Sequence, residues 1–478
     1  MGPAAPSSIV RGPFESSRGG ALEVHPKKIE LSRCHFNGKR PSKGAGRRGF
    51  DPSAVGQGRV DLRHSIIRRS GGVTIAFVLG HAFNFALFWG ADRILDSGRF
   101  GLFYTAVMTI GIVMSPMMAV TLVLARRFAE VGAKAGRRQV VAMTWVMLGL
   151  CMRAAPFVVA VGALLAVMAP WYSIEAWPIA LLIPITVLAL VVAEILRASL
   201  QSMLLFARAS ALWIVNTGSQ FGFSLGALFL FTKVWAGIAG IFVGATLASA
   251  AFLPWFARAT RQKASEPSKV ISLRLKQEIP VIISYSLFIL LNNVDILLGY
   301  VLLSRADLDT YAASALLPKA IIAATFAIAQ VVLPVVTDQH AGALPFRLSV
   351  IKGIAMAIVT AAAAAGLLWT VVPFVQRTAL AIRGLDVRLM NILAIGAVAM
   401  SALRVVVVIE VALQRYALGF AQAGAVVLFA FLCVTSHAGP TRIAELYLMI
   451  SSGFLILSGL MIAAMWTALS RAMHPPFH

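Results

Sequence analysis

The sequence predicts an all-α polytopic membrane protein with about 12 transmembrane helices in two pseudo-symmetric six-helix lobes. Hydrophobic residues make up 59% of the 478 residues and charged residues only 13%, whereas soluble domains have roughly 45–50% and 25%. Apolar runs of about 20 residues or more recur along the chain, which is the length an α-helix needs to cross a bilayer. The longest polar segment between these runs, Arg258 to Glu278, divides them six and six.

Composition divides the chain into five segments. Residues 1–70 contain 14 Lys/Arg against 5 Asp/Glu and no long apolar run, so we expect a basic, disordered cytoplasmic tail. An N-terminal lobe at 71–257 and a C-terminal lobe at 279–470 follow, joined by a cytoplasmic linker at 258–278. Residues 471–478 are expected to form a short cytoplasmic tail.

Twelve apolar spans are expected to form the membrane helices. They cover roughly 72–92, 100–124, 140–168, 178–197, 210–231, 234–256, 279–303, 310–336, 349–374, 389–412, 417–436 and 443–469. The pairs Gly222/Gly226 and Gly240/Gly244 have a spacing of four residues, at which helix backbones approach closely. We therefore expect both pairs to serve helix packing.

Two stretches of the chain share one plan, a helix end, a polar turn and a second helix. A shift of 208 positions places Asn84 on Asn292 and Phe103 on Tyr311, and the polar turns then coincide. The match lies in hydropathy and spacing more than in identical residues, and unrelated membrane hairpins share such features. An even number of spans in each half makes the two repeats parallel, as in duplicated transporters.

The distribution of Lys and Arg predicts the orientation in the membrane. With a cytoplasmic N-terminus, the internal loops and helix ends on that side hold 17 Lys/Arg, and those on the other side hold 8. Cytoplasmic loops carry the excess of basic residues, so both termini are predicted to be cytoplasmic. The same distribution accounts for the net charge of +23 without a nucleic-acid partner.

Three cations remain after the tail and loops are counted: Arg153, Lys319 and Arg404. Each lies near the middle of its span, where a cation facing lipid costs roughly 2.5–3.5 kcal/mol on insertion scales. We expect all three to face the protein interior or a water-filled cavity, where they can bind an anionic substrate such as a phosphate or diphosphate. The alternative is ion pairing, of Lys319 with Asp295 and of Arg404 with Glu410 or Asp295.

Polar residues in the first and seventh spans form a second candidate group. His81 and Asn84 lie one helical turn apart, and Asn292, Asn293 and Asp295 lie at the matching depth. These side chains can line a cavity or bind a coupling cation such as Na⁺ or H⁺, and interhelical hydrogen bonding is the simpler role. For Glu194, an i, i+3 pair with Arg197 is expected.

Several classes of protein find no support in the sequence. The chain has no P-loop, no Gly-x-Ser-x-Gly elbow and no His-Glu-x-x-His motif, and it is not expected to be an enzyme. Its three cysteines lie far apart and form no Cys/His ligand spacing, so neither a disulfide framework nor a metal site is expected. No cofactor is expected either.

The two hairpins resemble a known family. The segment RFGLFYTAVMTIGIVMSPMMAVTLVLARRFAEV looks like the second helix of the polysaccharide (O-antigen/exopolysaccharide) flippases of the multidrug/oligosaccharidyl-lipid/polysaccharide (MOP) exporter superfamily. The segment NNVDILLGYVLLSRADLDTYAASALLPKAIIAATFAIAQVVLPVV resembles their seventh and eighth helices. The resemblance spans about residues 65–470, with strong motifs in the two hairpins only. The long basic tail departs from the family, and twelve spans differ from the fourteen of the peptidoglycan-precursor flippases.

The resemblance implies a transporter of two six-helix lobes, like the MATE proteins of the same superfamily. It would move a polyprenyl-diphosphate-linked oligosaccharide across the bacterial plasma membrane for surface or exopolysaccharide biosynthesis. Its partners would be the anionic lipid-linked glycan, membrane lipids, and the polysaccharide polymerase and glycosyltransferases of the same pathway. The family's cationic cavities match Arg153, Lys319 and Arg404.

Two other functions are kept as alternatives. One is a cation-coupled drug or metabolite antiporter of the same fold, although midplane cations repel cationic drugs. The other is a membrane-embedded polysaccharide polymerase, which usually carries a large external loop, whereas every outer loop expected here is short.

Overall fold

The computed structural model describes residues 75–131, 133–168, 176–203, 205–261, 275–325, 328–329, 343–378, 381–413 and 417–473. All of these residues belong to one compact unit, Arg59–His478. The predicted basic tail at 1–70 and the final residues 474–478 lie outside the described residues. Most of the predicted linker at 258–278 does so too, although the flanking helices extend into both of its ends.

Every regular element in the described ranges is a helix, and each of the twelve predicted spans contains one. They are the first helix (Ile75–Ile94), α2 (Phe100–Val131), α3 (Ala133–Met168), α4 (Ala176–Ser202), α5 (Phe206–Phe231), α6 (Val234–Arg261), α7 (Leu275–Leu302), α8 (Arg305–Ala324), α10 (Ala343–Val375), α11 (Val387–Leu413), α12 (Ala417–Thr435) and α13 (Pro440–Met473). Eleven are long and apolar enough to cross a membrane. The described part of α8 is more polar than the other helices. The predicted all-α, multi-pass membrane fold is confirmed.

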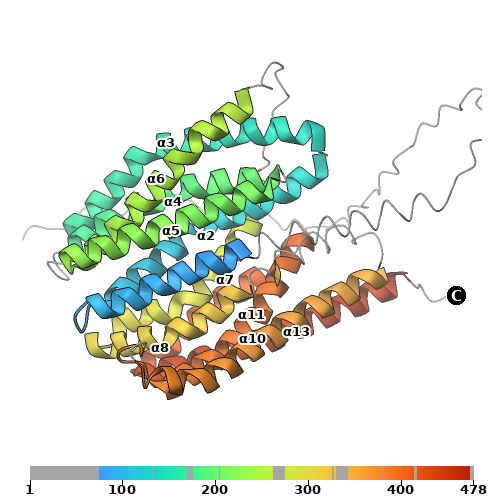
Figure 1. The fold of residues 1–478 in the computed structure, drawn as a ribbon. Helices are drawn as coiled ribbons and strands as arrows, with labels where there is room; N and C mark the ends of the chain where they lie inside the picture. The colour runs from blue at the N-terminus through green and yellow to red at the C-terminus, as the bar shows by residue number, and fades with distance from the viewer. Residues whose placement is uncertain are drawn as a thin grey trace, which may run out of the picture. The chain divides into compact units, whose positions relative to one another are not determined.

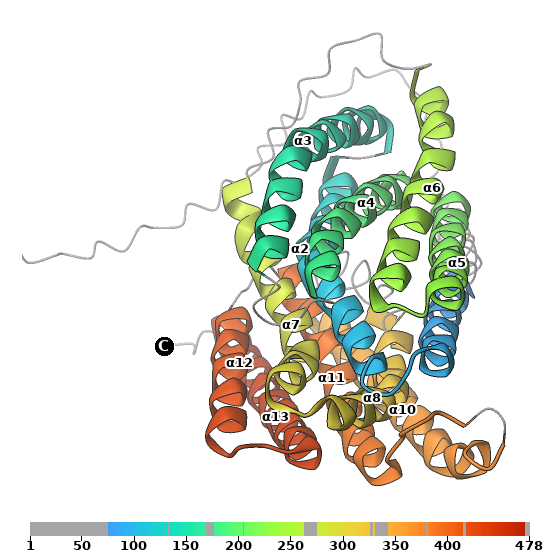
Figure 2. The same cartoon turned by 90° about the vertical axis from the view of Figure 1, so that its left-hand side faces the viewer.

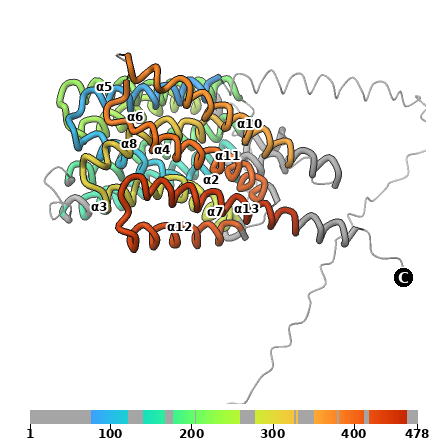
Figure 3. The backbone as a smooth tube through the Cα atoms, turned by 90° about the horizontal axis from the view of Figure 1, so that it is seen from below, coloured from blue at the N-terminus to red at the C-terminus, as the bar shows by residue number. Residues whose placement is uncertain are grey.

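The helices gather in two groups in the order of the chain (Figure 1). The first group comprises the first helix and α2 to α6: the first helix lies against α5, α2 and α3 pack on α4, and α6 packs on both α4 and α5. In the second group, α8, α10 and α13 pack around α11, and α12 packs on α7 and α13 (Figure 3). Helix α2 contacts α7 and α8 and so joins the two groups (Figure 2).

Helix α11 is the most buried helix of the second group. Within its membrane span, 83% of the residues lie inside the protein, compared with 17% in α10. A polar side chain on α11 therefore meets protein rather than lipid, and it needs a partner there. Arg404 is such a residue.

Glycine explains the close packing of α5 on α6. A Cβ atom at Gly240 would lie 2.4 Å from the Cα atom of Ser224, and one at Gly244 would lie 2.6 Å from the backbone nitrogen of Gln220. Both glycines are therefore required by the approach of the two backbones, as predicted. For Gly222 and Gly226 the packing prediction is wrong, because a Cβ atom there would meet nothing within 4 Å.

Candidate functional site

A buried polar cluster lies between α7, α8 and α13. We define the Asp295 cluster as Asn292 and Asp295 on α7, Tyr311 and Lys319 on α8, and Tyr447 on α13. The Lys319 Nζ atom lies 2.9 Å from Asp295 Oδ1 and also donates to the backbone carbonyl oxygen of Asn292. The Tyr311 hydroxyl donates to Asp295 Oδ2 at 3.0 Å. Both carboxylate oxygens of Asp295, which is 0% exposed, are therefore engaged.

Tyr447 closes the cluster from α13. Its ring centre lies 4.8 Å from the Lys319 Nζ atom, within the range of a cation–π interaction. Its hydroxyl donates to Asn292 Oδ1 at 3.4 Å. Gly396 on α11 makes room for this ring, because a Cβ atom there would lie 3.0 Å from it. The ammonium group is thus held by a carboxylate, a carbonyl oxygen and an aromatic face.

Arg404 lies beside this cluster on α11. Its guanidinium group donates to the backbone carbonyl oxygen of Ile322 on α8 at 2.8 Å. The same group lies 5.5 Å from the ring centre of Phe288 on α7. The guanidinium group therefore lies against α7 and α8, inside the second group of helices.

The structure separates the other predicted site residues. The Asn293 amide donates to the Ile289 carbonyl oxygen of its own helix, which is a local role. Asn84 is half-buried on the first helix. Arg153 is exposed on α3, on the same helical face as the exposed apolar side chains Leu150 and Phe157. The structure therefore does not bring Arg153 together with Lys319 and Arg404.

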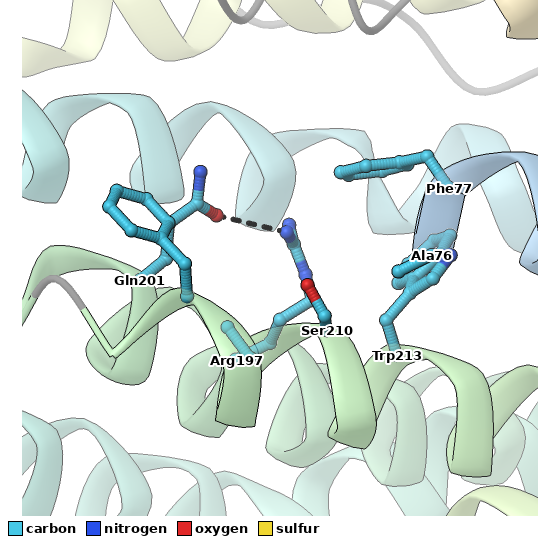
Figure 4. Close-up of a pocket in the computed structure, with 8 residues that line it drawn as sticks. Ala76, Phe77, Arg197, Gln201, Ser210 and Trp213 are labelled. Carbon is cyan, nitrogen blue, oxygen red and sulfur yellow. Dashed lines mark hydrogen bonds between the residues drawn. The ribbon is translucent and has the colours of Figure 1, made fainter. Parts of the chain in front are cut away.

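Glu194 and Arg197 form the predicted i, i+3 pair on α4, and aromatic rings surround it. Two guanidinium nitrogens of Arg197 donate to the Glu194 carboxylate, and Gln201 Oε1 accepts from a third at 3.1 Å (Figure 4). The guanidinium carbon lies 5.8 Å from the ring centre of Phe77 and 5.3 Å from that of Trp213. Only the charge pair was predicted from the sequence.

His81 lies beside the same aromatic rings. Its ring is stacked with Phe77 at 6.4 Å between ring centres and meets Trp213 edge-on at the same distance. The His81 side chain is half-buried, and these ring contacts come from the first helix and from α5.

A carboxylate of one group of helices caps a helix of the other. The Asp309 side chain on α8 accepts from the backbone N–H of Gly98 and from that of Gly101, the latter at 2.6 Å. Gly101 lies in the first turn of α2, and the residue before that helix, Arg99, has no side-chain acceptor to cap it. Asp309 therefore takes the part of an N-cap from the opposite side of the contact.

Backbone geometry makes this contact close. Gly98 has φ +84°, which favours glycine, and a Cβ atom at Gly101 would lie 2.9 Å from the Leu308 carbonyl carbon. Gly101 and Asp309 are 208 positions apart, which is the shift that aligns the two predicted repeats. The contact therefore joins equivalent positions of the two halves.

A second contact fastens the same two groups through the 376–386 segment. The Asp92 carboxylate on the first helix accepts from the backbone N–H of Arg383 at 2.9 Å. Arg93 donates to the Ala381 carbonyl oxygen. We call these bonds, together with those of Asp309, the two-lobe latch. In the predicted orientation it lies on the outer side of the membrane.

Sequence reasoning missed Tyr447, Asp92 and Asp309 as site residues. Tyr311 had been noticed only through its alignment with Phe103. Asp309 stands in a polar turn that the sequence presents as a loop, and its partner lies far away in the chain. Among the described residues that were searched, no group of three His, Cys, Asp or Glu side chains could hold a metal ion.

These observations define an all-helical, multi-pass membrane protein with ionisable residues buried where its two groups of helices meet. No protein-family model and no curated protein matches the sequence. Solved structures do match, and they include MATE and other MOP superfamily transporters.

Three of these structures show the extent of the likeness. A MATE protein in complex with MaL6 has a TM-score of 0.65 and 15% identity, and a MOP superfamily transporter from Pyrococcus furiosus has 0.62 and 15%. An outward-facing multidrug resistance MATE family transporter has 0.61 and 13%. Each match covers 85% of this chain and 96% of the other. At this identity the likeness shows the fold, which is that of the MATE and MOP transporters.

Proposed function

We propose that this chain is a flippase for an anionic lipid-linked saccharide, a polyprenyl-diphosphate-linked oligosaccharide of the bacterial plasma membrane. The observation that carries the proposal is the presence of positively charged side chains inside the protein. Arg404 and Lys319 lie inside the second group of helices, and while Lys319 is paired with Asp295, the Arg404 guanidinium group donates to a carbonyl oxygen and its charge favours the diphosphate of such a substrate.

The buried carboxylates support an anionic rather than a cationic substrate. In the described part of the chain five acidic side chains are buried: Asp92, Glu194, Glu278, Asp295 and Glu410. Each of them already has a partner in the protein. A cationic drug would have to displace one of these partners, whereas an anion can approach Arg404, which donates to the backbone carbonyl oxygen of Ile322, and leave the bond between Lys319 and Asp295 in place.

An apolar groove offers a place for the lipid portion of the substrate. It encloses about 370 Å³ between α10, α11 and α13. Its lining includes Ile358, Trp369, Ile395, Val398 and Leu455, all inside the membrane spans of their helices. Only hydrocarbon can fill such a groove at this depth without a desolvation cost, and an isoprenoid chain has that chemistry.

The two-lobe latch supports transport by alternating access. Its bonds hold the two groups of helices together at one end, so substrate would enter from the other end and leave after the latch breaks. In the predicted orientation, entry is from the cytoplasmic side, which is the direction of export.

A cation-coupled drug or metabolite antiporter remains the second candidate. The observation in its favour is the fold, which a multidrug resistance MATE transporter shares. The fold is equally compatible with both functions, so the engaged carboxylates are the basis for placing the flippase first.

Analysis of lipid intermediates in cells tests the proposal. In a strain lacking this chain, we expect one polyprenyl-linked glycan to accumulate in the membrane and its polymer to disappear from the surface. The wild-type chain and Arg153→Met should restore the polymer, and Arg404→Met should not. Complete surface polymer with unchanged intermediates would contradict the flippase and favour the antiporter.

A further inference from the structure

The surroundings of the Lys319 ammonium group are those of a small cation site. Asp295 Oδ1 lies 2.9 Å from Nζ, and the Asn292 carbonyl oxygen accepts from it. Carboxylate and carbonyl oxygens are the ligands that hard cations such as Na⁺ take in proteins. The Tyr447 ring, 4.8 Å away, adds the aromatic face that favours any cation.

The buried position of Asp295 favours a cation beside its carboxylate. The carboxylate side chain is 0% exposed and lies within a membrane helix, and the Lys319 side chain is only 10% exposed. Removing one partner of a buried ion pair leaves the other charge uncompensated, which is strongly unfavourable. Without Lys319 the Asp295 carboxyl group must either be neutralised by a proton or keep a cation beside it, and that cation can be a free ion or one carried by the protein.

We propose that the Lys319 ammonium group is a tethered replacement for a coupling Na⁺ ion. It fills an oxygen-lined site with a cation that the protein carries itself, so the wild-type chain takes up no Na⁺ there. Without the ammonium group, Asp295 and the Asn292 carbonyl oxygen form a site that binds Na⁺. This inference goes beyond the proposed substrate and does not depend on it.

A tethered cation has a consequence for the working cycle. A free Na⁺ ion can diffuse away, whereas the Lys319 ammonium group stays attached to α8. The same helix α8 carries Asp309 of the two-lobe latch. Movement of α8 would therefore act on both the latch and the ion pair.

Thermal unfolding of the purified full-length chain in detergent tests the inference. Unfolding temperatures are compared in NaCl and in choline chloride at equal ionic strength, for the wild type and for Lys319→Met. Lys352→Met, at an exposed lysine on α10, is the matched control. The double variant Lys319→Met with Asp295→Asn removes both charges and with them the need for a cation.

The wild type, Lys352→Met and the double variant should unfold at the same temperature in both salts. Lys319→Met should show a rise of its unfolding temperature that saturates with Na⁺ concentration, a response that the wild type lacks. The inference is overturned by a folded Lys319→Met protein that does not respond to Na⁺. Na⁺ binding by the wild type that Asp295→Asn abolishes would overturn it too. So would a Lys319→Met protein that folds in neither salt while the double variant folds, because an open site would have refilled with Na⁺.

Discussion

Removal of the Asp309 cap should shift the equilibrium between the closed and the open latch. Asp309→Ala removes the acceptor of two backbone N–H groups, those of Gly98 and Gly101. Loss of an N-cap side chain costs roughly 0.5–2 kcal/mol, and loss of a carboxylate from a helix N-terminus roughly 0.3–1 kcal/mol. Because these bonds exist only while the latch is closed, a total of about 2 kcal/mol shifts the ratio of closed to open protein roughly 30-fold.

Distances between spin labels at Ser97 and Ser436, in a chain without native cysteines, measure this shift. We expect Asp309→Ala to add a population with longer distances. Asp309→Asn should show a smaller change, because an asparagine oxygen still caps a helix. Asp307→Ala is the matched control, since the exposed Asp307 carboxylate bonds to Ser304 of its own helix cap. Identical distance distributions for Asp309→Ala and wild type would refute the role of the cap.

Two further predictions concern stability. Tyr311→Phe removes the hydroxyl that donates to Asp295 and should lower the free energy of unfolding by roughly 1.5–3 kcal/mol, measured by chemical denaturation; a change below about 0.5 kcal/mol would show that this bond contributes nothing. Gly240→Ala should lower the unfolding temperature, because its Cβ atom would overlap the Cα atom of Ser224, at a cost of roughly 1–3 kcal/mol. Gly222→Ala, which meets open space, should not lower it, and equal losses in the two variants would contradict the packing argument.

The helices of this protein could be predicted from the sequence because apolar length alone decides a membrane span. Which side of each helix faces the protein and which side faces lipid could not be predicted in the same way. Lipid and the protein interior are both apolar, so the apolar residues around Arg153 do not show which side of α3 faces the protein. The prediction that this cation points inward rested on the cost of exposing it, and the structure places it on an exposed apolar face.

For the buried charges, the sequence offered alternative partners and did not select between them. Asp295 and Lys319 were candidates for pairing, and the structure selects this pair. The Asp309 cap could not be found from the sequence, because it depends on how one half of the chain sits against the other. The shift of 208 residues aligns Gly101 with Asp309 but does not say that aligned positions touch.

Movement of a fluorescent polyprenyl-diphosphate-linked saccharide across liposomes that contain the purified chain tests the central claim most directly. A membrane-impermeant quencher added outside reports the fraction of the lipid that has changed leaflet. We predict that the wild-type chain and Arg153→Met move the lipid between leaflets and that Arg404→Met does not. Transport of a cationic dye driven by a Na⁺ or H⁺ gradient, with no movement of the lipid-linked saccharide, would contradict the account and identify a cation-coupled antiporter.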